Sequence, residues 1–175
     1  GVKVLANGGQ WDGGELGQSD VVEADDRQVG WNLQPALPGE QVLLDLNELA
    51  EGHEFFSLGS FDVATDGGRL LYGVDVEGDE RYKISVRTIP TGEVLEESVT
   101  GVGYGLVWAA DGESYYYTRV DEAWRPFQGW HHVVGEDPSA DTLLFTEEDA
   151  SYWLGIGGTH DDRWLVLSLG SKDTA

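Results

Sequence analysis

The stretch FDVATDGGRLLY, residues 61–72, decides the fold class because it recurs along the chain. A second copy, LVWAADGESYYY, occupies residues 106–117, and a weaker third copy, GIGGTHDDRWLV, occupies residues 155–166. Each copy reads as a strand, a polar Asp/Gly turn and an apolar or aromatic strand. Glycine supplies the positive φ of a tight hairpin turn and aspartate tolerates it. The sequence therefore predicts three β-hairpins, with starts offset by 45 residues and then by a further 49.

Two further β-type runs follow each of the first two copies, at residues 81–89 and 93–99 and at residues 127–134 and 142–145. Four strands in a period of about 45 residues are typical of a β-propeller blade. A β-sandwich also contains many short strands, but the fixed offset of the Asp/Gly turn favours the propeller. We predict an all-β, partial β-propeller of four-stranded antiparallel blades: two complete blades, the leading hairpin of a third, and an outer strand of a preceding blade at residues 41–46.

The first 40 residues differ from the regular region at 41–175. A glycine-rich run at 7–17 lies between two short strand candidates, residues 2–6 and 28–33. Closed propellers usually have four to eight blades, so this chain is not expected to close a ring. We expect self-association through exposed blade edges, or pairing of an N-terminal strand candidate with strands between residues 151 and 169.

The charge of the chain is strongly negative, with 33 acidic and 10 basic residues and a net charge of −23. Nucleic acid is excluded as a partner because phosphate binding needs a basic surface, whereas basic peptides suit this charge. There is no cysteine. No apolar stretch approaches the roughly 20 residues that span a bilayer, and the start of the chain does not read as a signal peptide. We expect no membrane partner and a cytoplasmic location.

Several segments resemble the propeller domain of oligopeptidase B-type serine peptidases, in the prolyl oligopeptidase family. They follow the family's order from about residue 38 to 175, and lie at residues 40–59, 104–111, 116–128 and 167–174. The resemblance implies a seven-bladed propeller that caps an α/β-hydrolase domain and admits peptides but not folded proteins. It also implies a parent that cleaves after basic residues.

The chain departs from the family in three ways. Residues 1–37 show no counterpart, and GWHH at residues 129–132 replaces a common Val-Trp-Arg-His, while His160 replaces Arg. The chain also ends before any hydrolase domain. These departures suggest a fragment with a foreign or rewritten N-terminal segment. The alternative is an engineered or selected binding or self-assembling protein built on that fragment.

Catalytic residues of the family are not expected in this chain. A serine peptidase of this type needs a Gly-x-Ser-x-Gly elbow, then Asp and His, and the sequence contains no such elbow. Ser19, in GQSD at residues 17–20, lacks the second glycine and a preceding strand. We expect a non-catalytic chain; an enzyme with an unrecognised carboxylate site is the remaining alternative.

The metal candidates are weak. Asp75, Glu77 and Asp79 place carboxylates in one short loop but lack the twelve-residue calcium pattern. Acidic runs at residues 147–149 and 161–162 read as turns. His131 and His132 are neighbours on a predicted strand, so they face opposite sides. Glycines at residues 101–105 precede a strand instead of a helix, which excludes a dinucleotide loop. We expect neither a metal nor a cofactor.

The aromatic side chains lie on or beside the predicted strands, where alternate members should fill the space between packed blades. Stacking on a sugar or a peptide is the functional alternative. The residues are Trp108, Tyr115, Tyr116, Tyr117, Trp124, Trp130, Tyr152, Trp153 and Trp164.

Overall fold

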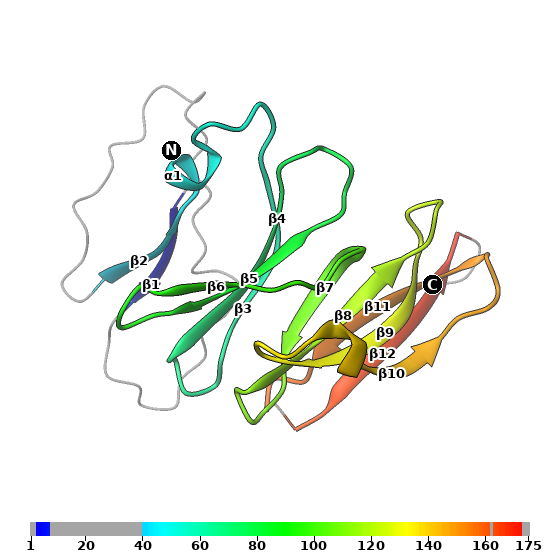
Figure 1. Cartoon of the computed structure of the whole chain (residues 1–175). Helices are drawn as coiled ribbons and strands as arrows, with labels where there is room; N and C mark the ends of the chain where they lie inside the picture. Colours follow the sequence, from blue (N-terminus) through cyan, green and yellow to red (C-terminus); the bar gives the residue numbers. More distant parts are fainter. Residues whose placement is uncertain (1–2, 8–39, 162, 173–175) are drawn as a thin grey trace. The chain divides into compact units, whose positions relative to one another are not determined.

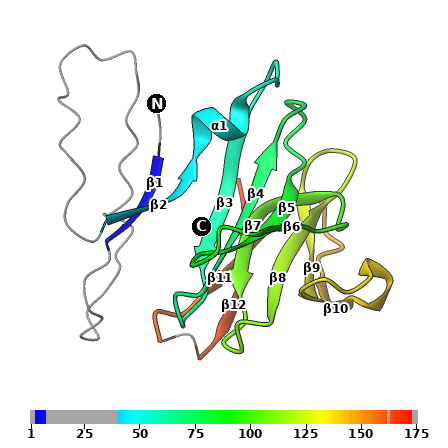
Figure 2. The same ribbon diagram turned by 60° about the vertical axis from the view of Figure 1, so that its left-hand side comes forward.

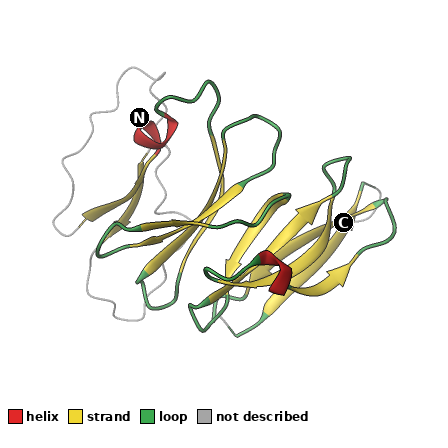
Figure 3. Cartoon of the chain, in the orientation of Figure 1, coloured by secondary structure: helices red, strands yellow, loops and turns green. Residues whose placement is uncertain are grey.

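Antiparallel β-strands make up almost all of the regular structure (Figure 3). The computed structural model describes residues 3–7, 40–161 and 163–172. The chain divides into two compact units, residues 1–53 and residues 54–175. The second unit contains all three copies of the sequence repeat.

In the first unit, β1 (Lys3–Asn7) pairs antiparallel with β2 (Glu40–Asp45). Both strands were expected, but β1 pairs with β2 and not with a strand between residues 151 and 169. A short helix, α1 (Leu46–Ala50), follows, and Asp45 caps it by accepting a hydrogen bond from the backbone N–H of Asn47. The strand candidate at 28–33 lies outside the described residues. Within the described residues, no helix is long and apolar enough to cross a bilayer.

The second unit holds two four-stranded sheets and one hairpin (Figures 1 and 2). The first sheet has the order β3-β4-β5-β6, and its strands are β3 (Ser57–Val63), β4 (Arg69–Asp75), β5 (Lys83–Thr88) and β6 (Val94–Glu96). The second sheet has the order β7-β8-β9-β10, and its strands are β7 (Val102–Trp108), β8 (Ser114–Val120), β9 (Pro126–Val133) and β10 (Thr142–Thr146). A short 3-10 helix, η2 (Pro138–Ala140), precedes β10.

The C-terminal hairpin consists of β11 (Tyr152–Gly158) and β12 (Leu165–Ser171), which pair without a register shift. Two complete four-stranded antiparallel blades and the leading hairpin of a third are therefore present. The predicted all-β, partial propeller is confirmed.

The first two repeat turns have the predicted Asp/Gly chemistry. Gly67 and Gly112 adopt positive φ values of 69° and 64°. Asp66 accepts a hydrogen bond from the N–H of Gly68 at 2.8 Å, and Asp111 accepts one from Glu113 at 2.8 Å. Each carboxylate thus holds its turn closed before the next strand begins.

The bonds that close the turns correct the spacing of the third copy. The N–H groups of Ala64, Ala109 and Thr159 donate to the carbonyls of Arg69, Ser114 and Trp164, respectively. Position 159 therefore corresponds to position 109, so the third hairpin follows the second by 50 residues (159 minus 109) and not by 49. With this spacing Asp161 corresponds to Asp66 and Asp111, and its carboxylate accepts from the N–H of Arg163 as theirs accept from Gly68 and Glu113.

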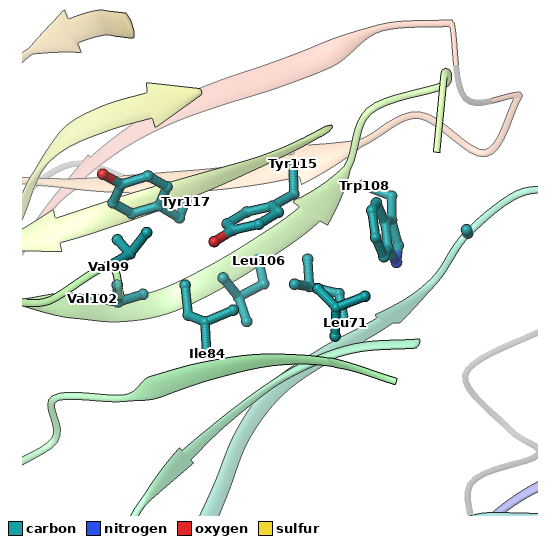
Figure 4. Close-up of a cluster of buried hydrophobic side chains, with 10 residues drawn as sticks. Leu71, Ile84, Val99, Val102, Leu106, Trp108, Tyr115 and Tyr117 are labelled. Carbon is teal, nitrogen blue, oxygen red and sulfur yellow. The ribbon is translucent and has the colours of Figure 1, made fainter. Parts of the chain in front are cut away.

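The main core lies between the first and second sheets (Figure 4). Leu71 and Ile84 from the first sheet face Leu106, Tyr115 and Tyr117 from the second, and all five are buried. Trp108 lies edge-on to Tyr115, with ring centroids 6.4 Å apart. The predicted packing of aromatic residues between blades is confirmed for these three aromatics, whereas Trp124, Trp153 and Trp164 are exposed.

Polar bonds between neighbouring strands join the two sheets in addition to the core. Asp62 on β3 accepts two bonds from Trp108 on β7: its carboxylate binds the backbone N–H at 2.8 Å and its carbonyl binds the indole N–H at 3.0 Å. Ser60 accepts from the N–H of Gly105 at 3.1 Å. The two innermost strands are therefore fixed to each other side by side.

Candidate functional site

The acidic loop after β4 is organised by its own backbone. Asp75 is buried, and its carboxylate accepts hydrogen bonds from the N–H groups of Glu77, Gly78 and Glu80 at 2.8–2.9 Å. Burial raises the pKa of Asp75, but the bonds from the backbone N–H groups outweigh it and lower the pKa below its ordinary value. The Asp75 carboxylate therefore serves as the internal brace of this loop.

The other two metal candidates in this loop have cationic partners. Oε1 of Glu77 lies 3.5 Å from Nζ of Lys83, and Oδ2 of Asp79 lies 3.1 Å from Nη1 of Arg81. Within the described residues, no group of three or more His, Cys, Asp or Glu side chains is arranged to hold a metal ion. Asp149 and Asp161 accept bonds from nearby N–H groups of Ser151 and Arg163, as in the predicted turns. Asp162 lies outside the described residues.

The two adjacent histidines do face opposite sides of β9. The ring of His131 lies against Tyr116, with centroids 5.2 Å apart. His132 is fully buried on the other face. The alternation predicted from the sequence is therefore confirmed, and it places one imidazole in the interior.

His132 lies between two buried carboxylates from different parts of the chain. Its Nδ1 is 2.6 Å from Oδ1 of Asp141, which precedes β10, and its Nε2 is 3.2 Å from Oε2 of Glu97, which follows β6. Both carboxylate side chains are almost fully shielded from solvent. The imidazole therefore links the outer strand of the first sheet to the outer half of the second.

Three further groups complete what we call the His132 network. The hydroxyl of Tyr117 donates to Oδ2 of Asp141 at 2.6 Å, and the N–H of Gly135 donates to Glu97 at 3.1 Å. The guanidinium of Arg119 lies 3.9 Å from the same Asp141 oxygen and 4.4 Å from the centroid of Trp130. Burial and the bond to Asp141 both raise the pKa of Tyr117, so its hydroxyl keeps its proton.

The chemistry of this network is structural. A general base needs one ring nitrogen free to reach a substrate or a nucleophile, but both nitrogens of His132 face carboxylates. A buried imidazole with two carboxylates is well suited to hold elements together. We assign it the role of a clamp between two blades.

Sequence reasoning missed this network. The members of the network come from several segments between residues 97 and 141, and Glu97 and His132 are 35 positions apart along the chain. The alternation of β9 pointed to one buried histidine, and a buried histidine needs polar partners. That requirement was the one available signal, although it could not identify the partners.

Comparison with known proteins assigns the chain to a family. A model described as "Prolyl oligopeptidase, N-terminal beta-propeller domain" matches residues 18–175. The chain therefore belongs to the prolyl oligopeptidase propeller family. The match begins at residue 18, so residues 18–37, which we expected to lack a counterpart, lie within it, while residues 1–17 lie outside.

The relatives are peptidases much longer than this chain. The chain is 37% identical over 134 residues to dipeptidyl aminopeptidase BI of Pseudoxanthomonas mexicana, covering 76% of this chain and 18% of the relative. It is 38% identical over 138 residues to protease 2 of Moraxella lacunata, covering 78% and 20%. Oligopeptidase B from Leishmania major superposes with a TM-score of 0.70 at 26% identity, covering 76% and 19%. The chain thus spans about a fifth of the length of the proteins it matches.

Proposed function

We propose that this chain forms part of the gate through which peptides reach the active site of an oligopeptidase B-type serine peptidase. The observation that carries the proposal is the family match over residues 18–175 together with two complete four-stranded blades. The sequence lacks a Gly-x-Ser-x-Gly elbow. In this proposal the chain therefore lines the passage to the active site and does not supply the catalytic residues.

The charge of the chain supports basic peptides as the molecules admitted. A net charge of −23 creates a negative potential that concentrates cationic ligands. Binding of an Arg- and Lys-rich peptide, followed by fluorescence anisotropy, should exceed that of an acidic peptide of equal length. It should weaken between 0.1 M and 1 M salt, because the Debye length falls from about 10 Å to about 3 Å. Equal binding of both peptides would remove this part of the proposal.

A segment exchange tests the gating role. Residues 38–175 replace the matching segment of protease 2 of Moraxella lacunata, and the hybrid is assayed on a short peptide that protease 2 cleaves and on a folded protein. We expect cleavage of the peptide and protection of the folded protein. A matched hybrid with Leu71→Ala, which loosens the core between the two sheets, should protect less well. Cleavage of the folded protein by the first hybrid would contradict the gate.

The isolated chain is expected to have no peptidase activity. An assay with basic dipeptide substrates checks this, with the full-length relative as the positive control. Turnover that co-purifies with the chain and survives further purification would instead support an unrecognised carboxylate site.

The alternative function, a binding or self-assembling protein, is favoured by one observation. Among the described strands, β12 has a neighbour on one side only, since its sheet contains only β11 and β12. Such an edge is a template for another strand, whatever the origin of the N-terminal segment.

A further inference from the structure

The His132 ring lies where the two complete blades meet at their outer strands. It belongs to β9, while Glu97 directly follows β6, the outermost strand of the first sheet, and Asp141 directly precedes β10, the outermost strand of the second. The side chains of all three residues are at most 2% exposed. Because water does not reach these groups, their charges must be balanced within the network itself.

The two contacts of the ring need two hydrogens between them. Nδ1 lies 2.6 Å from Oδ1 of Asp141, and Nε2 lies 3.2 Å from Oε2 of Glu97. A neutral imidazole has one N–H and one lone pair, and an ionised carboxylate can only accept. With a neutral ring, one nitrogen lone pair would face a carboxylate oxygen with no hydrogen between them. One further proton must therefore reside on the ring or on one of the two carboxyl groups.

The other bonds of the two carboxyl groups favour their ionised forms. The second oxygen of Asp141 accepts from the hydroxyl of Tyr117 at 2.6 Å and lies 3.9 Å from the guanidinium of Arg119. Glu97 accepts from the backbone N–H of Gly135 at 3.1 Å. Donors and nearby cations both stabilise a carboxylate against its acid form. The further proton therefore belongs on the imidazole, which becomes an imidazolium with a donor at each nitrogen.

The charges of the network also balance with an imidazolium. Glu97 and Asp141 supply two negative charges and Arg119 supplies one positive charge, so a neutral ring would leave one negative charge uncompensated. Uncompensated charge is costly in a protein interior. A positive ring brings the sum to zero. The net charge of −23 adds a negative potential that stabilises any buried cation further.

The tyrosines that face the ring keep their protons (Figure 4). The ring of Tyr115 lies 5.0 Å from that of His132, centroid to centroid. Burial raises the pKa of Tyr115, and the charges of Glu97 and Asp141 raise it further. Burial and the bond to Asp141 raise the pKa of Tyr117. Both phenols therefore stay neutral from about pH 6 to about pH 9, a range in which imidazole is the side chain suited to change its charge.

We propose that a proton joins the two blades at their outer strands, held as an imidazolium at His132 between Glu97 and Asp141, and that the joint loosens when this proton passes to solvent. Its loss removes one of the two hydrogen bonds and leaves two carboxylates against a neutral ring. The bonds between the inner strands β3 and β7 use backbone and indole N–H groups as donors, which do not titrate in this range. The pH-sensitive joint is therefore confined to the outer side of the blades.

This proton makes the stability of the chain fall as the pH rises. Histidine in an unfolded chain loses its proton near pH 6.5, whereas the folded network holds the proton at neutral pH. Stability falls with rising pH wherever the folded chain binds more protons than the unfolded chain. The contribution of His132 is therefore fully present below about pH 6.5 and is lost as the pH rises, until the folded ring is also neutral. One proton changes the unfolding constant by up to about tenfold per pH unit in this window.

The variant His132→Gln tests this dependence, because an amide donates at one atom, accepts at the other and does not titrate. Urea denaturation between about pH 6 and pH 9 gives the unfolding constants. We expect the ratio of the constant of His132→Gln to that of the native chain to fall at least about tenfold over this range. The control is His131→Gln, whose ring lies on the opposite face of β9 against Tyr116, and its ratio should change much less. Parallel profiles of the native chain and His132→Gln would overturn the proposal.

Nuclear magnetic resonance of the native chain labelled with nitrogen-15 gives a readout that does not require any variant to fold. The ring signals of His132, assigned through bonds from its own backbone, report whether one or both nitrogens carry a proton. We expect both to be protonated at about pH 7.5 and one proton to be lost on titration to higher pH. A ring with a single proton at about pH 7.5 would overturn the proposal.

The variant Glu97→Gln tests whether the first blade takes part in the joint. It keeps the size of the side chain but removes one of the two charges that stabilise the imidazolium, so the ring should lose its proton at a lower pH than in the native chain. Glu136→Gln, at an exposed position, is the control and should leave the ring titration nearly unchanged. Equal titrations in the native chain and Glu97→Gln would overturn the joint between the blades. The gate proposal would stand in that case, since it rests on the family match.

Discussion

Leu71 on β4 and Val166 on β12 occupy the same position in two copies of one hairpin, each seven residues after the N–H that closes its turn. Leu71 is completely buried, and Val166 is 47% exposed. Leu71 faces the second sheet, whereas in the described structure no sheet lies against Val166. The comparison shows that the turn residues are enough to form the hairpin, whereas the burial of a side chain at this position depends on a neighbouring blade.

The largest effect is expected when the side chains at these two positions are shortened to alanine. Leu71→Ala should lower the free energy of unfolding by about 2–5 kcal/mol because it opens a cavity in the core between the sheets. Val166→Ala, measured where the chain is monomeric, should lower it by less than about 1 kcal/mol. Urea denaturation of both variants provides the measurement. Similar losses would mean that β12 is covered as thoroughly as β4.

The His132 network should account for a comparable share of the stability of the two complete blades. Asp141→Ala leaves His132, Tyr117 and Arg119 without their shared acceptor. Removal of one partner from a buried charged group costs about 3–5 kcal/mol. The exposed neighbour Glu136 serves as the control, and Glu136→Ala should change the stability by less than about 0.5 kcal/mol. A small effect of Asp141→Ala would show that the clamp does not hold the blades.

Acid should weaken the complete blades through Asp75. Its pKa is lowered in the folded chain, so its contribution is present above the unfolded value of about 3.9 and is lost as the pH falls through the folded value. Asp75→Asn should cost about 1–3 kcal/mol at pH 7, because an amide N–H₂ replaces one accepting oxygen. The difference from the native chain should shrink below about pH 4. A difference that stays constant down to pH 2 would contradict this account.

The smallest expected effect is a gain in stability where the second blade meets the C-terminal hairpin. Gly129 on β9 is buried, and a Cβ there would be at ordinary contact distance, 3.6 Å, from Leu154 and Leu167. Gly129→Ala should raise the free energy of unfolding by about 0.5–1 kcal/mol, since glycine in a strand interior is costly. Gly105→Ala is the contrasting variant, because its φ is 114° and its Cβ would lie 2.5 Å from Ile156. That variant should be destabilised.

Most of the fold could be predicted from local sequence. The Asp/Gly turns located all three hairpins, and the expected strands at 81–89 and 127–134 correspond to β5 and β9. The strand expected at 93–99 is the main exception, because β6 ends at Glu96. The N–H of Glu97 still donates to the carbonyl of Ile84 on β5, but its carboxylate binds His132, and Val99 enters the core between the blades. A contact with another blade overrides the local strand preference at these residues.

The candidate site was far less predictable than the fold. Asp75 lies in a loop whose acidic composition suggested metal ligands, yet its oxygens are used by backbone N–H groups of the same loop. The partners of His132 come from the ends of β6 and η2, and local periodicity contains no information about such contacts. Propensity and alternation describe one strand or one turn. The network depends on how two blades are packed.

The bonds from β3 to β7 also affect how the chain assembles. Ser60 with Gly105 and Asp62 with Trp108 are separated by 45 and 46 residues, whereas each hairpin closes over six residues, as in Ala64–Arg69. Local hairpins form in about 1–10 μs, but a ribosome adding about 5–20 residues per second needs roughly 2–9 s to deliver the next 45. The first sheet is therefore synthesised and paired well before its neighbour exists, and the blades are expected to fold in the order of translation.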